Sequence, residues 1–168
     1  STNLFLMRHP ELLKKPGRVV QANHQTKGRG RLGRNYISLP GRHLTFSAVI
    51  HPDLPLSMIQ GIALLAGVAV ARVLEPRIKG VKLKWPNDVL IKRHKICGIL
   101  VETTLVEEIK HPVLILGIGL NINGHASDFP EELREKLTTL EECGVLVERQ
   151  LIFLELLQQL KQVMWEFS

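Results

Sequence analysis

The chain has 168 residues, 45% of them hydrophobic, which is enough to bury a core and argues against disorder. Its 22 Lys and Arg exceed its 16 Asp and Glu, and the resulting formal charge of +6 favours anionic partners without choosing among them. The two cysteines lie far apart, which argues against a disulfide framework or a structural zinc site and fits a reducing cytoplasm. The most apolar window, residues 61–71, is shorter than the roughly 20 residues that span a bilayer, so we expect no membrane association.

The first half of the chain predicts a short helix, two strands and a longer helix. The opening STN is typical of a helix start, and Pro10 interrupts the helical pattern that follows. Residues 18–25 and 44–50 are predicted strands, so the loop between them joins two strands. A helix introduced by Pro and Ser is predicted over residues 55–74, and its surface is apolar nearly all round.

The second half predicts more strands and then helices. Four β-rich runs separated by short polar turns cover residues 81–85, 88–93, 95–106 and 112–122. The pattern turns helical from Pro130 onward, and residues 149–167 carry apolar side chains at the spacing of an amphipathic helix. Strands followed by helices indicate an α+β domain.

The stretch GRGRLGR, residues 28–34, combines three arginines with three glycines. Glycine lets the main chain approach a ligand, and each guanidinium offers a planar fork of donors that suits carboxylate and phosphate. The heptapeptide alone favours an anion site no more than a solvated loop or an RNA-binding segment. Its position between two strands, flanked by Gln25 and Tyr36, favours a clamp that closes on a small anionic ligand.

Three further motifs are each ambiguous alone. KWPND places Asn87 and Asp88 in a turn fixed by Pro86, and the spacing alone slightly favours an ordinary hairpin. KICGIL brings Lys95 into a strand three residues before a glycine, which is also common for a solvated lysine. GIGLNIN lacks the third glycine of a dinucleotide site because Ile122 takes its place. The seven histidines are scattered without ligand spacing, so we expect no metal site formed by the protein.

Taken in order, these motifs resemble the catalytic domain of biotin protein ligases, also called biotin–acetyl-CoA-carboxylase ligases, which are related to lipoate ligases. The motifs are STN, QTKGRGRLGRNY, KWPND, KICGILVE and GIGLNIN, from Ser1 to about Asn123. The resemblance implies a class II synthetase-like fold with a mixed, largely antiparallel sheet flanked by helices. It also implies that residues 1–168 are a single catalytic domain truncated at both ends, without the DNA-binding helix-turn-helix or the small β-barrel domain of longer members.

The resemblance further implies a cytoplasmic ligase that uses biotin, ATP and Mg²⁺ bound through the ATP phosphates. Biotin would be activated to biotinyl-5′-AMP and then transferred to a lysine of a carboxylase carrier domain. Lys95 would be the main catalytic cation with Arg29 and Arg31 assisting, and Asp88 would orient or deprotonate the incoming lysine. The implied biotin-binding residues are Ser1, Thr2, Asn3, Gln25, Gly28, Arg29, Gly30, Arg31, Lys95 and Gly98. The implied ATP-binding residues are Arg31, Arg34, Tyr36, Asn87, Lys95, Asn121 and Asn123.

Two alternatives and the oligomeric state stay open at this point. A lipoate or octanoate ligase would share the same carboxylate-activation chemistry. A basic nucleic-acid-binding domain could use the Arg-Gly loop, although Tyr36 is the one aromatic residue near it for base stacking. The resemblance is compatible with a monomer and with a homodimer, and it implies no DNA partner.

Overall fold

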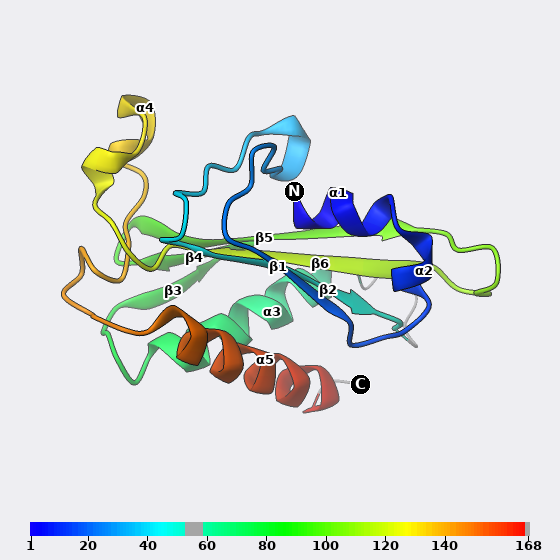
Figure 1. The fold of residues 1–168 in the computed structure, drawn as a ribbon. Coiled ribbons are helices and arrows are strands. Elements are labelled where there is room, and N and C mark those ends of the chain that lie inside the picture. Colours follow the sequence, from blue (N-terminus) through cyan, green and yellow to red (C-terminus); the bar gives the residue numbers. More distant parts are fainter. Residues whose placement is uncertain (53–58, 167–168) are drawn as a thin grey trace.

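The computed structural model describes residues 1–52 and 59–166, which form one six-stranded sheet with helices on both faces (Figure 1). The described elements, in chain order, are α1 (Thr2–Met7), α2 (Pro10–Leu13), β1 (Val19–Ala22), the 3-10 turn η1 (Arg31–Gly33), β2 (Leu44–Ile50), α3 (Ile59–Leu74), β3 (Val81–Lys84), β4 (Asp88–Ile91), β5 (His94–Thr104), β6 (Val113–Leu120), the 3-10 turn η3 (Ala126–Asp128), α4 (Glu131–Arg134) and α5 (Arg149–Glu166).

The sheet has the strand order β1-β2-β6-β5-β4-β3, and the pairings between these strands are antiparallel. Strands β3 to β6 form a meander. Strand β6 also pairs with β2, so β2 and β6 lie inside the sheet and join the meander to β1. Gly117 of β6 therefore lies between Ser47 of β2 and Leu100 of β5. This register places residues from three separate strands in one row on one face, because alternate residues of a strand face the same side.

One face of the sheet is covered by α3 and α5, and the main core lies between these helices and the strands. Buried alanines such as Ala66 let α3 approach the strands closely, and Phe46 meets Phe153 of α5 edge to face at 5.1 Å. The opposite face carries α1 and α2, whose Leu6 and Leu13 bury against a smaller cluster. In Figure 1 the Arg-Gly loop and α4 also rise on the side of α1. The polar motifs thus share one side of the sheet.

The structure confirms the predicted α+β class, and it refines several element boundaries. Pro10 begins α2 instead of interrupting a single helix, because proline is well suited to the first helical turn. Helix α3 continues to Leu74 as predicted, and its predicted start at residues 55–57 lies outside the described residues. Likewise, α5 begins at Arg149 as predicted, and Phe167 lies beyond the described end. Within the described residues no helix is long and apolar enough to cross a bilayer.

The prediction of extended helix from Pro130 onward is wrong for most of residues 130–148. Helix α4 is only four residues long because the chain that follows it pairs with β5 instead of continuing the helix. The Lys95 amide donates to the Lys136 carbonyl at 2.8 Å, and the Thr138 amide donates to the Lys95 carbonyl at 3.0 Å. The backbone beside Lys95 therefore anchors this segment.

Candidate active site

A cavity of about 450 Å³ lies on the α1 side of the sheet, which is within the usual size range of small-molecule sites. Its walls come from α1, the Arg-Gly loop, the turn after β3, strands β5 and β6, and the segment around α4. Of the predicted site residues it brings together Ser1, Thr2, Asn3, Gln25, Arg29, Gly30, Arg31, Arg34, Tyr36, Asn87, Asp88, Lys95, Gly98 and Asn121. Residues far apart in the chain therefore meet at one hollow.

The Arg-Gly loop is a small hairpin that folds back on itself. The Tyr36 amide donates to the Gly28 carbonyl at 3.1 Å, and the Gly30 amide donates to the Arg34 carbonyl at 2.7 Å. A Cβ atom on Gly28 would overlap the Tyr36 carbonyl, so this glycine permits close approach of the two limbs. Leu32 at the tip has a positive φ of 55° and is 88% exposed. The hairpin holds its arginines on a defined backbone.

The glycines of β6 make room for two cavity residues. A Cβ atom on Gly119 would overlap the Tyr36 ring, and one on Gly117 would overlap the Asn3 amide. Tyr36 therefore packs directly on the sheet, and its hydroxyl donates to Asn121 Oδ1 at 3.4 Å. Burial raises the pKa of the Tyr36 hydroxyl far above its ordinary value, so the phenol stays protonated. The GIGLNIN glycines thus fix the floor of the cavity.

Replacing Gly119 with alanine is expected to lower the free energy of unfolding by about 1–3 kcal/mol, because the new methyl group must displace the Tyr36 ring. Urea denaturation measures the change. Gly61→Ala is the matched control, since a Cβ atom there meets nothing within 4 Å. Combining Gly119→Ala with Tyr36→Ala should remove the overlap, so the double variant should be no less stable than Tyr36→Ala alone. Equal stability of Gly119→Ala and Gly61→Ala would contradict this packing.

Lys95 and Asp88 form an ion pair at one end of the cavity. Lys95 Nζ lies 2.6 Å from Asp88 Oδ1, and the two side chains are 31% and 22% exposed. Asp88 opens β4 opposite Gly98 of β5, and a Cβ atom on Gly98 would lie 3.0 Å from the Lys95 side chain. The lysine thus lies across the sheet toward the carboxylate. The Lys95 cation and the Asp88 carboxylate, a potential base, therefore both line the cavity.

The predicted asparagines differ in position. Asn87 lines the cavity, yet its amide nitrogen donates to the Ile99 carbonyl at 2.7 Å and holds the turn to β5. Asn121 also lines the cavity, and its amide nitrogen donates to the Thr138 carbonyl at 3.1 Å. Asn123 and Gly28 are not among the described residues that line it. The Asn123 backbone amide instead donates to the Arg42 carbonyl at 3.0 Å.

Helix α1 closes the other end of the cavity with buried polar groups. Gln25 Oε1 accepts from the Thr2 backbone amide at 2.7 Å, and the Gln25 backbone amide donates to Ser38 Oγ at 3.0 Å. Ser47 Oγ lies 2.6 Å from Thr2 Oγ1 and also contacts Asn3 Oδ1. Gln25 and Ser38, which flank the Arg-Gly loop, are therefore bonded to each other, and Gln25 is also bonded to α1.

Comparison with known proteins identifies the family. Residues 1–121, well over half of the chain, match the biotin/lipoate A/B protein ligase family. The chain belongs to this family. It is 40% identical over 130 residues to the bifunctional ligase/repressor BirA of Bacillus spizizenii, a match that covers 76% of this chain and 39% of that protein. It is 36% identical over 153 residues to the biotin–[acetyl-CoA-carboxylase] ligase of Mycobacterium tuberculosis, covering 86% of this chain and 53% of that one.

A solved structure confirms the fold expected of this ligase family. The biotin protein ligase from Aquifex aeolicus in complex with biotin and ATP matches with a TM-score of 0.83 at 34% identity, covering 99% of this chain and 67% of that chain. The resemblance inferred from the five motifs is thus confirmed. The chain spans only about 39% of the Bacillus relative and 53% of the mycobacterial one.

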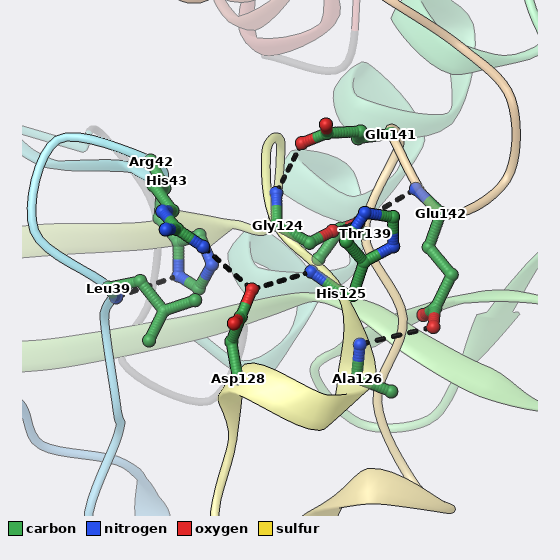
Figure 2. Close-up of polar contacts among 10 residues, drawn as sticks. All are labelled: Leu39, Arg42, His43, Gly124, His125, Ala126, Asp128, Thr139, Glu141 and Glu142. Carbon is green, nitrogen blue, oxygen red and sulfur yellow. Dashed lines mark hydrogen bonds and ion pairs between the residues drawn. The ribbon is translucent and has the colours of Figure 1, made fainter.

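A cluster of polar contacts anchors the α4 segment of this ligase-family domain (Figure 2). Asp128 Oδ2 accepts from Arg42 Nη1 at 2.7 Å and from the His125 amide at 2.9 Å. Glu141 accepts from the Gly124 amide, and Glu142 accepts from the Ala126 amide at 3.1 Å. These contacts fix both ends of a stretch whose middle, at Leu133 and residues 135–137, lines the cavity. None of them was predicted from the sequence, because they join turns with no regular spacing.

Stability is expected to fall in mild acid because of His43, which is buried beside this cluster. Burial, helped by neighbouring Arg42 and opposed by Asp128, lowers the pKa of His43 to about 4. The neutral ring accepts from the Leu39 amide through Nδ1 at 3.3 Å and stacks on Phe129. Below a pH of about 6.5 the unfolded chain gains a proton here that the folded chain does not take up until about pH 4.

The expected loss from His43 between pH 7 and pH 5 is about 2 kcal/mol of unfolding free energy. Urea denaturation at several pH values measures it. His43→Phe should be less dependent on pH over this range, because phenylalanine cannot take up the proton. An identical pH dependence in the variant and the original chain would show that His43 is not the responsible group.

The ligase-family site also includes residues that the motifs did not single out. Glu102 of β5 accepts from Asn3 Nδ2 at 2.9 Å and pairs with Arg29 Nη2 at 3.1 Å. Ser47 supplies the buried hydroxyl beside α1. One signal for Glu102 was present in the sequence. It lies four residues after Gly98 on the same strand, so alternation places it on the cavity face.

Proposed function

We propose that this domain activates biotin with ATP to give biotinyl-5′-AMP and pyrophosphate, and then transfers biotin to a lysine of a carboxylase carrier domain. The observation that carries the proposal is the convergence of Lys95, Arg31 and Arg34 on one cavity whose other end is formed by α1. The relatives named as biotin ligases, and the similar structure described with biotin and ATP, support the same chemistry.

The first step requires an anionic carboxylate to attack an anionic phosphate, so cations must offset their repulsion. Within the described residues, no ion pair involves Arg31 or Arg34, and both arginines are exposed at the cavity. Lys95 is already 2.6 Å from Asp88, so a ligand phosphate would compete with that carboxylate for the ammonium. Lys95 would then stabilise the charge that develops as the new bond forms.

The second step requires the incoming lysine to lose a proton before it attacks the acyl carbonyl, because an ammonium has no lone pair. Asp88 would receive or orient that proton once Lys95 has turned toward the acyl phosphate. Pyrophosphate leaves in the first step and AMP leaves in the second. The hairpin of residues 28–36 would cover the mixed anhydride and shelter it from water.

Biotin is favoured over lipoate or octanoate because the end of the cavity away from Lys95 is polar. Thr2, Asn3 and Gln25 line it, and they offer hydrogen-bonding groups that a ureido ring can use and an alkyl chain cannot. The Arg-Gly hairpin folds over this cavity and Arg29 is held by a carboxylate, which favours a small-molecule site over a nucleic-acid surface.

A competition experiment tests the choice of acid. The protein is given ATP with equal concentrations of biotin, lipoate and octanoate for less than one turnover, and the acyl-adenylates are separated by mass. Biotinyl-5′-AMP should dominate. A product made mostly from lipoate or octanoate would overturn the proposed substrate while leaving the family assignment intact.

We propose that Mg²⁺ enters bound to the ATP phosphates. Within the described residues, no three His, Cys, Asp or Glu side chains are grouped so that they could hold a metal ion. The phosphate oxygens would supply much of the coordination, as is common for this ion, and the ion would neutralise phosphate charge. The free thiols of Cys97 and Cys143 support a cytoplasmic location.

A further inference from the structure

Glu102 occupies a position between two parts of the site without lining the cavity itself. Its side chain is 17% exposed on the central strand β5. One carboxylate oxygen pairs with Arg29 Nη2 at 3.1 Å, and the other accepts from Asn3 Nδ2 at 2.9 Å. The two partners belong to the Arg-Gly hairpin and to α1. A single carboxylate thus bridges both.

The Asn3 side of this bridge is fixed. Asn3 is 2% exposed and packs over Gly117, where any larger residue would overlap it. Its amide oxygen contacts Ser47 Oγ, so the amide nitrogen is turned toward Glu102. Since α1 is tied to the sheet in this way, the Asn3 contact fixes one oxygen of the Glu102 carboxylate, and the other oxygen holds Arg29.

The Arg29 side of this bridge is the more exposed one. Arg29 belongs to a glycine-rich hairpin whose tip is exposed, and its side chain is 47% exposed. A partly exposed ion pair contributes only a small stabilisation, which is enough to influence how often a short hairpin stays over the cavity. Glu102 balances the charge of Arg29, and Asp88 balances that of Lys95, so Arg31 and Arg34 contribute more of the positive charge available to a ligand.

We infer that Glu102 is a positioning residue that holds the Arg-Gly hairpin against α1 through Arg29. The inference rests on the proposed function only for its effect on biotin. Loss of the contact should loosen the hairpin and weaken biotin binding, while the chemical step at Lys95 stays nearly unchanged. Glu102→Gln is the sharpest variant, because its amide nitrogen must face one of the two donors and so breaks at least one contact without changing size.

The first readout does not depend on activity. Trypsin cleaves after arginine, so cleavage after Arg31 and Arg34 reports how often the hairpin opens. Glu102→Gln should be cut several-fold faster at these bonds than the original chain. Glu108→Gln is the matched control, since it breaks an exposed ion pair with Lys14 away from the cavity. Equal cleavage rates in Glu102→Gln and Glu108→Gln would overturn the inference.

The second readout separates positioning from catalysis. In biotin-dependent adenylate formation, Glu102→Gln should raise the KM for biotin about 10-fold and change kcat less than about threefold, as expected for one lost charged contact. Arg29→Met should raise the KM for biotin at least as much, and the double variant should be no worse than Arg29→Met alone. Additive effects in the double variant would show that Glu102 does not act through Arg29, and would overturn the inference.

The two readouts keep the inference separate from the proposed function. If the original chain forms no biotinyl-5′-AMP, the proposed function fails while the trypsin comparison still decides the role of Glu102. Should Glu102→Gln lower the stability of the whole domain, Arg29→Met tests the same contact from its exposed side. Faster cleavage after Arg31 and Arg34 in Arg29→Met would support the inference, and unchanged cleavage would overturn it.

Discussion

Replacing Lys95 with alanine is expected to slow biotinyl-adenylate formation by about 100- to 1,000-fold, the usual cost of removing one preorganised charge from a reacting centre. The Lys95 ammonium lines the cavity beside Gly98, and its ordinary partner Asp88 is 2.6 Å away. No other lysine of β5 can replace it, because Lys95 is the one lysine in that strand. The measurement is the single-turnover rate at saturating biotin and ATP.

Lys82→Ala is the matched control for Lys95→Ala. Lys82 is an exposed lysine of the edge strand β3 and is not among the described residues that line the cavity. It should change the rate less than about twofold, as is usual for a surface substitution. Full activity in a folded Lys95→Ala variant would remove Lys95 from the proposed role.

Replacing Asp88 with asparagine is expected to slow transfer to the carrier by about 100-fold, while adenylate formation slows less than about 10-fold. Asparagine keeps the shape of Asp88 and can still accept from Lys95, but it cannot take a proton from the incoming lysine. The two half-reactions are measured separately, first by the burst of biotinyl-5′-AMP and then by its consumption on addition of carrier.

The two half-reactions of Asp88→Asn serve as controls for each other. A loss confined to transfer supports the assignment of Asp88 to the second step. Equal losses in both steps would mean that Asp88 acts mainly by holding Lys95, and would contradict that division of roles. The ion pair at 2.6 Å makes this comparison necessary, since Asp88→Asn also removes the negative charge beside Lys95.

The secondary structure was largely predictable because strand and helix signals are local. Alternation and turn residues located β2 and the four later strands, and the apolar spacing located α5. The strand order was not predictable in this way. Pairing of β2 with β6 joins residues about 70 positions apart, and their local patterns do not specify which partner each strand selects. The short α4 depends on a similar distant contact with Lys95.

The candidate site was predictable to the extent that its residues lie in motifs. The ordered motifs located most of the cavity walls, including Lys95 and Asp88. They did not predict that these two residues form an ion pair, because the contact depends on strand register across β4 and β5. Nor did they predict Glu102, whose role follows from two partners on distant elements. Motifs thus identified most of the residues that line the cavity, and packing determined their contacts.

Exchange of labelled pyrophosphate into ATP tests the central claim most directly. If Lys95, Arg31 and α1 form one pocket in which biotin and ATP react, the folded protein should catalyse exchange that requires biotin and is lost in Lys95→Ala. Omitting biotin sets the background. Exchange no faster than that background, from folded protein saturated with both ligands, would contradict the account.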